Sequence, residues 1–242
     1  MNVDDLCIVV GKQTMPVVIN RRKRARYLRL RLNYRNQVAV SVPWHCSHRK
    51  ALRFVEKHRE WLKQQLACIP RVHKVSQWLK KYPFVSAYGN RFAACIDSNS
   101  CKRAGYLVDR ERQEILLRMP DSHSDFDVSL QRLIKSFAKE VISCRLKYHA
   151  QRLGLNFKKL SIRDQVSRWG SCSARGSISL NWRLVLIAPE LQDYVMLHEL
   201  AHLTEMNHSC RFWALLDQYD PNRLAHETGL NSITAEIMRV GR

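Results

Sequence analysis

Strict alternation of apolar and polar residues predicts β-strands in the first part of the chain. Between residues 28 and 32 leucine alternates with arginine, and residues 38–42 repeat the alternation with valine after a polar turn. A period of two places the leucines against a core and Arg29 and Arg31 on the opposite face. We interpret this arginine face, together with the basic run at residues 21–26, as a surface for an anionic partner; the alternative is an ordinary solvated strand face.

A helical period follows in two places. Ser47 is positioned to cap an amphipathic helix of about residues 47–67, and a longer helix is expected from about Phe126 to Leu153. Short strands separated by turn signals are expected between them, over residues 84–119. Together these elements predict a fold of the α+β class.

A change of composition at Pro120–Asp125 marks the expected domain boundary. Residues 1–120 are expected to form a β-rich N-terminal part with the one amphipathic helix, and residues 121–242 a second unit. In the second unit, short strands are expected at residues 160–162 and at Ser177–Asn181, on either side of a polar loop.

A third helix is expected to begin near Pro189, a residue that suits the first turn of a helix. Its residues are apolar on almost every side, so the helix should be buried at the centre of the second unit. It nevertheless carries a glutamate and two histidines. Burying such side chains costs free energy unless they are paired or bind a metal.

These polar residues form the sequence His198-Glu199-Leu200-Ala201-His202. Histidines four positions apart lie on the same face of a helix and can bind one divalent cation. Glu199 can reach a water molecule on that cation without being a ligand itself. This H-E-x-x-H arrangement is typical of zinc hydrolases, although three fixed positions are a modest signal alone.

A third histidine completes the expected ligand set. His208 lies six residues after His202, and Asn207 before it tolerates the left-handed conformation that ends a helix and turns the chain back. Three nitrogen ligands leave an open position for water, so we expect one Zn²⁺ per chain, or another divalent metal. Glu205 competes as third ligand if the helix continues; otherwise it is a candidate to orient a histidine.

The chemistry expected at such a site is metal-assisted hydrolysis. The cation lowers the pKa of its bound water, and Glu199 takes the proton as general base and passes it to the leaving group. Arg168, Arg183 and Tyr194 are candidates to contact the substrate or to stabilise the developing oxyanion. Nothing in the sequence distinguishes among them, and either arginine can instead hold a loop.

Several segments around the motif resemble one known family. They are Arg168-Trp169-Gly170-Ser171-Cys172-Ser173, Leu180-Asn181-Trp182-Arg183-Leu184, the histidine motif, and Asn207-His208-Ser209 with Phe212-Trp213. In combination, over most of residues 20–220, they resemble the YgjP-like metallopeptidase-type family, which is similar to the SprT and WLM proteases that act near DNA. The resemblance implies a zincin-like catalytic unit, with His198, His202 and His208 as ligands and Glu199 as catalytic acid/base.

The same segments carry further expectations. The ligand spacing equals that of metzincins, but Glu205 stands where those proteases have glycine. Trp169 and Cys172 are expected close to the metal, in a structural or substrate-positioning role; the alternatives are a packed turn and a buried thiol. Phe212 and Trp213 are expected to be core residues that anchor the segment carrying His208.

The sequence has a large excess of basic residues. Lys and Arg number 41 against 21 Asp and Glu, a net charge of +20, which suits a partner that bears phosphate, such as nucleic acid or a nucleotide. The alternative is a basic protein whose charge only keeps it dispersed. The eight cysteines form no C-x-x-C pair, and neither a secretory signal nor a membrane-spanning run is found, so we expect a cytoplasmic protein with reduced thiols and no membrane partner.

Three functions stay open at this stage. The first is a zinc metallopeptidase in which the strand Ser177–Asn181 pairs with an extended peptide. The second is a metal-dependent hydrolase of nucleotides or other phosphoanhydrides, which the net charge and Arg168, Arg175 and Arg183 favour. The third is a nucleic-acid-associated protein with a structural metal, bound through the basic N-terminal face. The open coordination position and Glu199 argue against the third.

Overall fold

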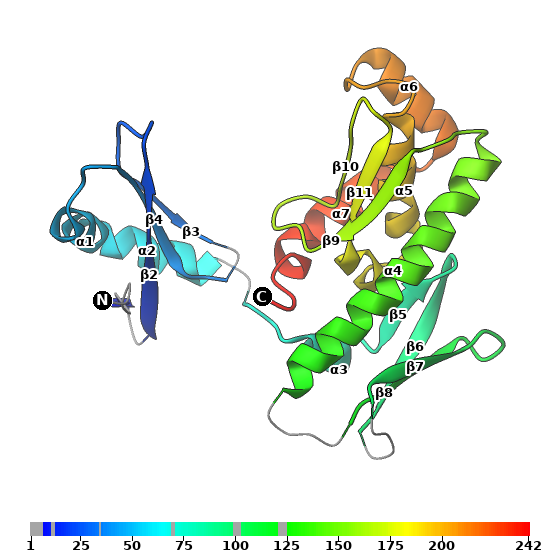
Figure 1. The fold of residues 1–242 in the computed structure, drawn as a ribbon, viewed down its shortest axis with the longest axis horizontal. Helices are drawn as coiled ribbons and strands as arrows, with labels where there is room; N and C mark the ends of the chain where they lie inside the picture. Colours follow the sequence, from blue (N-terminus) through cyan, green and yellow to red (C-terminus); the bar gives the residue numbers. More distant parts are fainter. Residues whose placement is uncertain (1–6, 11–12, 34, 69–70, 99–102, 121–124) are drawn as a thin grey trace. The chain divides into compact units, whose positions relative to one another are not determined.

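The computed structural model describes residues 7–10, 13–33, 35–68, 71–98, 103–120 and 125–242. The chain divides into two compact units, which consist of residues 1–72 and residues 73–241 (Figure 1). Within the described residues, three small sheets and seven α-helices confirm the expected α+β class.

The first unit is built on a four-stranded sheet with the order β1-β2-β4-β3. Its strands are β1 (Cys7–Val10), β2 (Gln13–Arg22), β3 (Arg29–Leu32) and β4 (Val38–Pro43). β2 and β4 run parallel, and the other neighbours run antiparallel. The valines of β4 are fully buried and the leucines of β3 pack against the same core, whereas Arg29 and Arg31 are exposed. The expected alternation is therefore confirmed.

Helices α1 (His48–Lys57) and α2 (Arg59–Cys68) pack against this sheet. Ser47 caps α1 as expected, because its hydroxyl accepts a hydrogen bond from the N–H of Lys50 at 3.3 Å. The expectation of one helix over residues 47–67 is wrong, however, since the helix is interrupted.

The interruption lies at His58. Its Nδ1 is 2.8 Å from the carbonyl oxygen of Phe54, which is the group that the His58 N–H would bond in a continuous helix. The N–H bonds instead to the carbonyl of Val55 at 3.0 Å. The imidazole thus competes with its own backbone for one acceptor, and α1 ends there.

The second unit begins with α3 (Val75–Lys81) and a sheet with the order β5-β6-β8-β7. The strands of this sheet are β5 (Phe84–Ala87), β6 (Asn90–Asp97), β7 (Gly105–Asp109) and β8 (Glu114–Arg118). β5 and β7 contact α4 (Phe126–Arg152), which matches the long helix expected from the sequence.

The boundary between the compact units falls after Val72 rather than after residue 120. The sheet of residues 84–118 packs on α4, for example through the edge-to-face rings of Tyr106 and Phe137, 5.3 Å apart. It therefore belongs with the residues that follow it. Residues 121–124, within the segment where we expected the boundary, lie outside the described residues.

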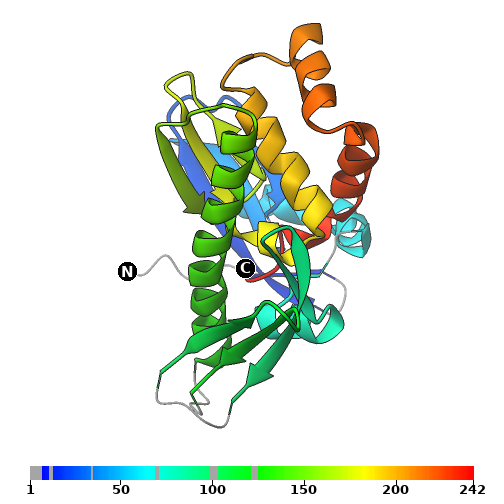
Figure 2. The ribbon, with the colours of Figure 1, turned by 90° about the vertical axis from the view of Figure 1, so that its right-hand side faces the viewer.

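A three-stranded sheet lies farther along α4, as the two views of the ribbon show (Figures 1 and 2). It consists of β9 (Lys159–Arg163), β10 (Gly170–Cys172) and β11 (Ser177–Asn181), in the order β10-β11-β9. β11 is antiparallel to β10 and parallel to β9. β9 and β11 were expected, whereas β10 lies in the stretch interpreted as a polar loop.

Helix α5 (Pro189–Ala201) lies at the centre of the second unit. It follows the 3₁₀-helix η1 (Trp182–Leu186) and precedes α6 (Cys210–Tyr219) and α7 (Arg223–Ile237). It contacts α4, α6, α7, β5 and β10, and nine of its 13 residues are buried. The expected buried helix beginning at Pro189 is confirmed. In the part of the chain that is described, no helix has the length and apolar character needed to cross a membrane.

Candidate metal centre

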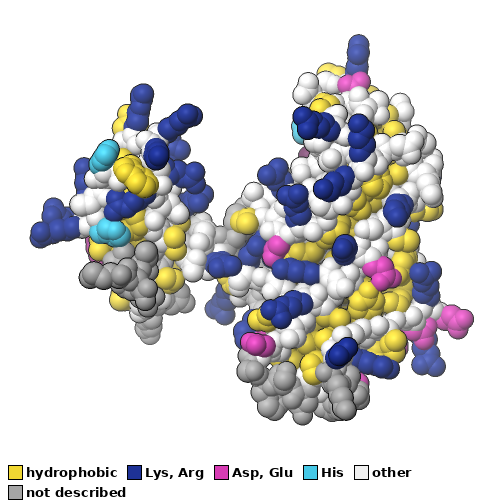
Figure 3. All heavy atoms as spheres, viewed as in Figure 1, with side chains coloured by type: hydrophobic (Ala, Val, Ile, Leu, Met, Phe, Trp, Pro, Cys, Tyr) yellow, Lys and Arg dark blue, Asp and Glu magenta, His cyan; other side chains and the backbone are white. Residues whose placement is uncertain are grey.

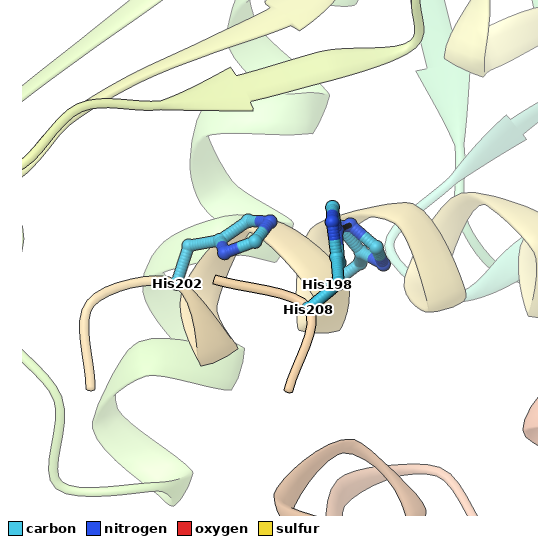
Figure 4. A group of neighbouring side chains, drawn as sticks. All are labelled: His198, His202 and His208. Carbon is cyan, nitrogen blue, oxygen red and sulfur yellow. Dashed lines mark hydrogen bonds between the residues drawn. The ribbon is translucent and has the colours of Figure 1, made fainter. Parts of the chain in front are cut away.

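The three histidines singled out in the sequence lie together in the structure (Figure 4). His198 is in the last turn of α5, His202 directly follows that helix, and His208 lies in the loop before α6. One nitrogen of each ring lies within 4.8 Å of the others, and the Nε2 atoms of His198 and His208 are 3.1 Å apart. The three imidazoles can therefore hold one metal ion.

A tight turn brings the chain back from α5 to the site. The N–H of Leu203 bonds to the carbonyl of Leu200 at 3.0 Å, and that of Thr204 to Ala201 at 3.1 Å. These bonds span three residues instead of four and end the helix. Asn207 does not have a positive φ, so the left-handed turn expected at that residue is wrong.

Aromatic rings hold two of the histidines in place. Phe212, fully buried in α6, stacks on the ring of His202 with centroids 4.5 Å apart, and Trp213 stacks on His208 at 5.4 Å. Ser209 caps α6 by accepting a hydrogen bond from the N–H of Phe212. Phe212 is therefore a core residue as expected, whereas Trp213 is only partly buried. The contacts of both rings agree with the expected anchoring role.

A backbone carbonyl sets the tautomer of His202. Its Nδ1 lies 3.1 Å from the carbonyl oxygen of Glu205, which can only accept a hydrogen bond. Nδ1 therefore carries the hydrogen and Nε2 keeps a free lone pair for a metal. Glu205 supports the site through its backbone. Among the described residues, its carboxylate is not in the close group of ligand atoms, because α5 ends before it.

Burial favours the neutral form of the His198 and His202 imidazoles. Burial, together with the neighbouring His202 and His208, lowers the pKa of His198 to about 4. Burial also lowers the pKa of His202, against the opposing effect of hydrogen bonds to backbone carbonyls. Neutral imidazole is the form that binds metal ions, so these two rings need not lose a proton at neutral pH before ligation.

Glu199 is buried, and one of its carboxylate oxygens has no hydrogen-bond partner among the described residues. The residue is 5% exposed, and that oxygen is Oε2. Burial raises the pKa of Glu199 to about 8, and the positive charge of Arg168 lowers it only in part. A buried acid without a partner costs stability, and such groups cluster at functional sites.

Gly170 makes room for Glu199. A Cβ atom at position 170 would lie 2.6 Å from Cγ and 2.7 Å from Cδ of Glu199. β10 therefore approaches α5 so closely that only glycine fits there without a shift. Sequence reasoning noted the Trp169-Gly170 pair but missed this contact, because nothing local shows how close the strand comes to the helix.

Two of the candidate substrate contacts lie near the histidines. Arg168 is exposed and is close enough to Glu199 to lower its pKa. Tyr194 is one turn before His198 on α5, and the centroids of the two rings are 6.1 Å apart. Burial raises the pKa of Tyr194 to about 12, so its phenol stays protonated at neutral pH.

Arg183 has a different role. It is fully buried, and its guanidinium donates hydrogen bonds to the carbonyl oxygen of Val240 from Nε at 2.8 Å and Nη2 at 2.6 Å. Nη1 lies 2.6 Å from Oδ1 of Asp164. The group holds the C-terminal segment and has no exposed surface with which to contact a substrate. We therefore withdraw Arg183 as a candidate for substrate or oxyanion contact.

The segment before β11 is tied to the fold by Trp169, whose Nε1 donates a hydrogen bond to Thr234 of α7 at 2.9 Å. Cys172, at the end of β10, is a half-buried free thiol. Burial raises the pKa of Cys172 to about 11, and the negative charge of Glu199 adds to the effect. Trp169 is thus structural, and the thiol stays protonated at neutral pH.

The strand expected to receive a peptide is not available for pairing. β11 is the middle strand of its sheet, with β10 on one side and β9 on the other. Its backbone groups are therefore already engaged. The edge strand of this sheet that contacts α5 is β10. With three residues, β10 is too short to show a period-two pattern in the sequence.

The sequence and the fold were compared with those of known proteins. A family model described as "YgjP-like, metallopeptidase domain" matches residues 26–233. Among solved structures, the metallopeptidase zymogen abylysin of Pyrococcus abyssi is similar at 22% identity and a TM-score of 0.35, over 39% of this chain and 97% of that chain. No curated protein gives a significant match.

Proposed function

The chain belongs to the YgjP-like family of metallopeptidase domains, and from this premise we propose that it is a zinc-dependent peptidase. His198, His202 and His208 hold the ion, and Glu199 is the general base. The observation that carries the proposal is the buried Glu199 carboxylate, whose Oε2 lacks a partner among the described residues, next in the chain to a trio of converging imidazoles.

The donor set suits zinc. Three imidazole nitrogens with a fourth position open are typical of catalytic zinc sites, and neutral rings suit a borderline ion better than magnesium or calcium, which prefer oxygen. The carbonyl of Glu205 orients His202, as groups behind metal ligands commonly do. Other divalent metals that accept imidazole stay possible occupants.

The proposed hydrolysis combines the chemistry of the bound ion with a proton transfer by Glu199. When bound, the ion supplies Lewis-acid chemistry, which acidifies a water molecule and polarises the carbonyl group of the substrate. In its ionised form, Glu199 takes the proton of the attacking water on Oε2 and delivers it to the leaving amine. Gly170 keeps the space in which that carboxylate lies.

Two further groups assist in this proposal. The phenol of Tyr194 has a pKa of about 12 and therefore keeps its proton at neutral pH. It donates a hydrogen bond to the developing oxyanion. Arg168 contributes a positive charge close to Glu199 and helps to bind the substrate. We expect an extended peptide to pair with the free edge of β10, since β10 contacts α5 and forms one side of its sheet.

A phosphoanhydride substrate is less well supported. Of the three arginines that favoured it, Arg183 is buried and engaged. Residues 1–72 hold 16 of the 41 Lys and Arg but only four of the 21 Asp and Glu, so much of the charge surplus belongs to the first unit. The net charge therefore says little about what the histidine site hydrolyses.

A cytoplasmic location stays a prediction. All seven cysteines in the described part of the chain are free, which agrees with a reducing compartment.

The test compares metal content in purified wild type and His202→Ala, with His48→Ala, an exposed histidine of α1, as matched control. We expect about one zinc ion per chain in wild type and in the control, and loss of the ion in His202→Ala. Casein and nucleoside triphosphates are then assayed in parallel. Cleavage of casein supports the proposal. Release of phosphate without proteolysis selects the alternative, and absence of stoichiometric metal removes both.

A further inference from the structure

The first unit carries a depression of about 670 Å³ lined mainly by arginine. Arg22, Arg24, Arg26, Arg29 and Arg31 line it together with Tyr27. They come from the end of β2, the connection that follows, and β3, and all five arginines are exposed. Figure 3 shows that Lys and Arg side chains stand out over much of the surface of this unit.

These arginines have no acidic partner among the residues that the structure describes. In the described part of the first unit, the carboxylates are Glu56 and Glu60, and each pairs with a basic residue three positions along the chain. None of the described carboxylates pairs with the five arginines of the depression. A cluster of like charges at this spacing repels itself, so the field that it creates attracts an anion that carries several charges.

Exposed aromatic rings accompany the arginines. Tyr27 is 73% exposed within the depression. Trp44, which directly follows β4, is 51% exposed, and the ammonium of Lys23 lies 6.0 Å from its ring centroid. Arg21 fixes this segment by donating a hydrogen bond to the carbonyl of Trp44 at 3.0 Å. Large aromatic side chains exposed to water among unpaired cations can stack on flat ligands.

We propose that this depression binds single-stranded nucleic acid, with guanidinium groups on the phosphates and Tyr27 and Trp44 stacked on bases. A positively charged groove combined with exposed aromatic rings is the arrangement by which proteins bind single strands without reading sequence. The cations that line the depression are all arginine, whose planar fork matches phosphate and stacks on bases, whereas lysine serves equally well at a membrane surface. The proposal does not depend on the metal centre.

The test measures fluorescence anisotropy of labelled 20-nucleotide oligo(dT) and oligo(U) with the full chain, over a range of salt concentrations. The main variant is Arg26→Glu/Arg29→Glu. Its matched control is Lys139→Glu/Lys147→Glu, two exposed lysines of α4 that change net charge equally. We expect the arginine variant to bind about 10-fold or more weakly and the control to bind nearly as well as wild type. The slope of log affinity against log salt should become shallower by roughly 0.7 for each phosphate that the variant no longer neutralises.

Stacking is tested separately. Tyr27→Ala should weaken binding of single strands roughly 10-fold, whereas Tyr27→Phe, which keeps the ring, should bind like wild type. Binding of either oligo(dT) or oligo(U) supports the proposal, and their relative affinity tells DNA from RNA. Equal competition by polyglutamate or by phosphatidylserine vesicles, equal losses in the lysine control, no effect of Tyr27→Ala, or no binding at all would overturn it.

Discussion

Two acidic residues of α5, six positions apart, have surroundings that shift their pKa values in opposite directions. Asp193 accepts a hydrogen bond from Nε of Arg145 at 2.8 Å, and Nε2 of His149 lies 2.9 Å away. Burial raises the pKa of Asp193, but these partners outweigh burial and bring the pKa below its ordinary value. Glu199 is buried, its Oε2 has no partner in the described part of the chain, and its pKa rises to about 8.

Under the proposed function, this difference lets one helix serve both stability and chemistry. The region around Asp193 joins α5 to α4 through a charge that is fully compensated, so its burial costs little. Around Glu199, no partner among the described residues compensates the free-energy cost of burying the carboxylate. A bound ligand or substrate would offset that cost. A substitution at either carboxylate should alter one region and leave the other intact.

The largest effect is expected for Glu199→Gln. Without a general base, cleavage of peptide substrates should fall about 100- to 10,000-fold, while zinc content and the unfolding midpoint stay near those of wild type. Steady-state cleavage, metal analysis and thermal unfolding on the same preparation measure all three. A variant that binds zinc and cleaves at the wild-type rate would show that Glu199 is not the base.

The converse change is Asp193→Asn. It leaves Arg145 and His149 without their anion and should lower the free energy of unfolding by on the order of 3 kcal/mol, while the folded protein still cleaves at low temperature. Urea titration measures the loss. Glu190→Gln, an exposed acid in the first turn of α5, is the control and should cost less than about 1 kcal/mol. Equal losses in both variants would contradict the assigned role.

Gly170→Ala tests the contact between β10 and Glu199. The added Cβ would displace the carboxylate, so cleavage should fall about 100-fold. Overpacking should also lower the free energy of unfolding by about 1–3 kcal/mol. Gly105→Ala is the matched control because no atom of the described residues lies within 4 Å of a Cβ at that position. An active, stable Gly170→Ala protein would refute the close approach.

The smallest effect is the pH dependence of stability in metal-free protein. The lowered pKa of Asp193 adds stability above its ordinary value of 3.8, which is lost as pH falls through and below that value. The raised pKa of Glu199 adds stability below its ordinary value of 4.5, which is lost as pH rises toward 8. Each limb should slope by at most about 1.4 kcal/mol per pH unit.

Unfolding in chelator across the pH range gives both limbs. Asp193→Asn should flatten the acid limb alone, and Glu199→Gln the alkaline limb alone. If one variant flattens both limbs, the two carboxylates do not titrate independently.

Much of the fold could be predicted where one local pattern decides the structure. Strict alternation identified β3 and β4, and an apolar surround identified α5 as buried from its first residue, Pro189. The three histidines could be found because they lie within 11 residues, so helix geometry and one turn suffice to bring them together. No contact with a distant part of the chain had to be known.

The rest depended on contacts between distant segments. Gly170 meets Glu199 only because β10 packs against α5, and Arg183 is buried because the C-terminal segment at Val240 covers it. His58 interrupts an amphipathic helix because its imidazole contacts the backbone carbonyl of Phe54. The expectation that a peptide pairs with β11 was wrong because the sequence of one strand does not determine whether that strand lies in the middle or at the edge of its sheet.

The central claim is that three histidines hold one ion, that Glu199 lies beside it without binding it, and that Cys172 is not a ligand. X-ray absorption at the zinc edge on the loaded protein tests this most directly. We predict three nitrogen scatterers of imidazole and one further light atom, all at about 2.0–2.1 Å. A sulfur scatterer at about 2.3 Å, or fewer than three imidazoles, would contradict the account.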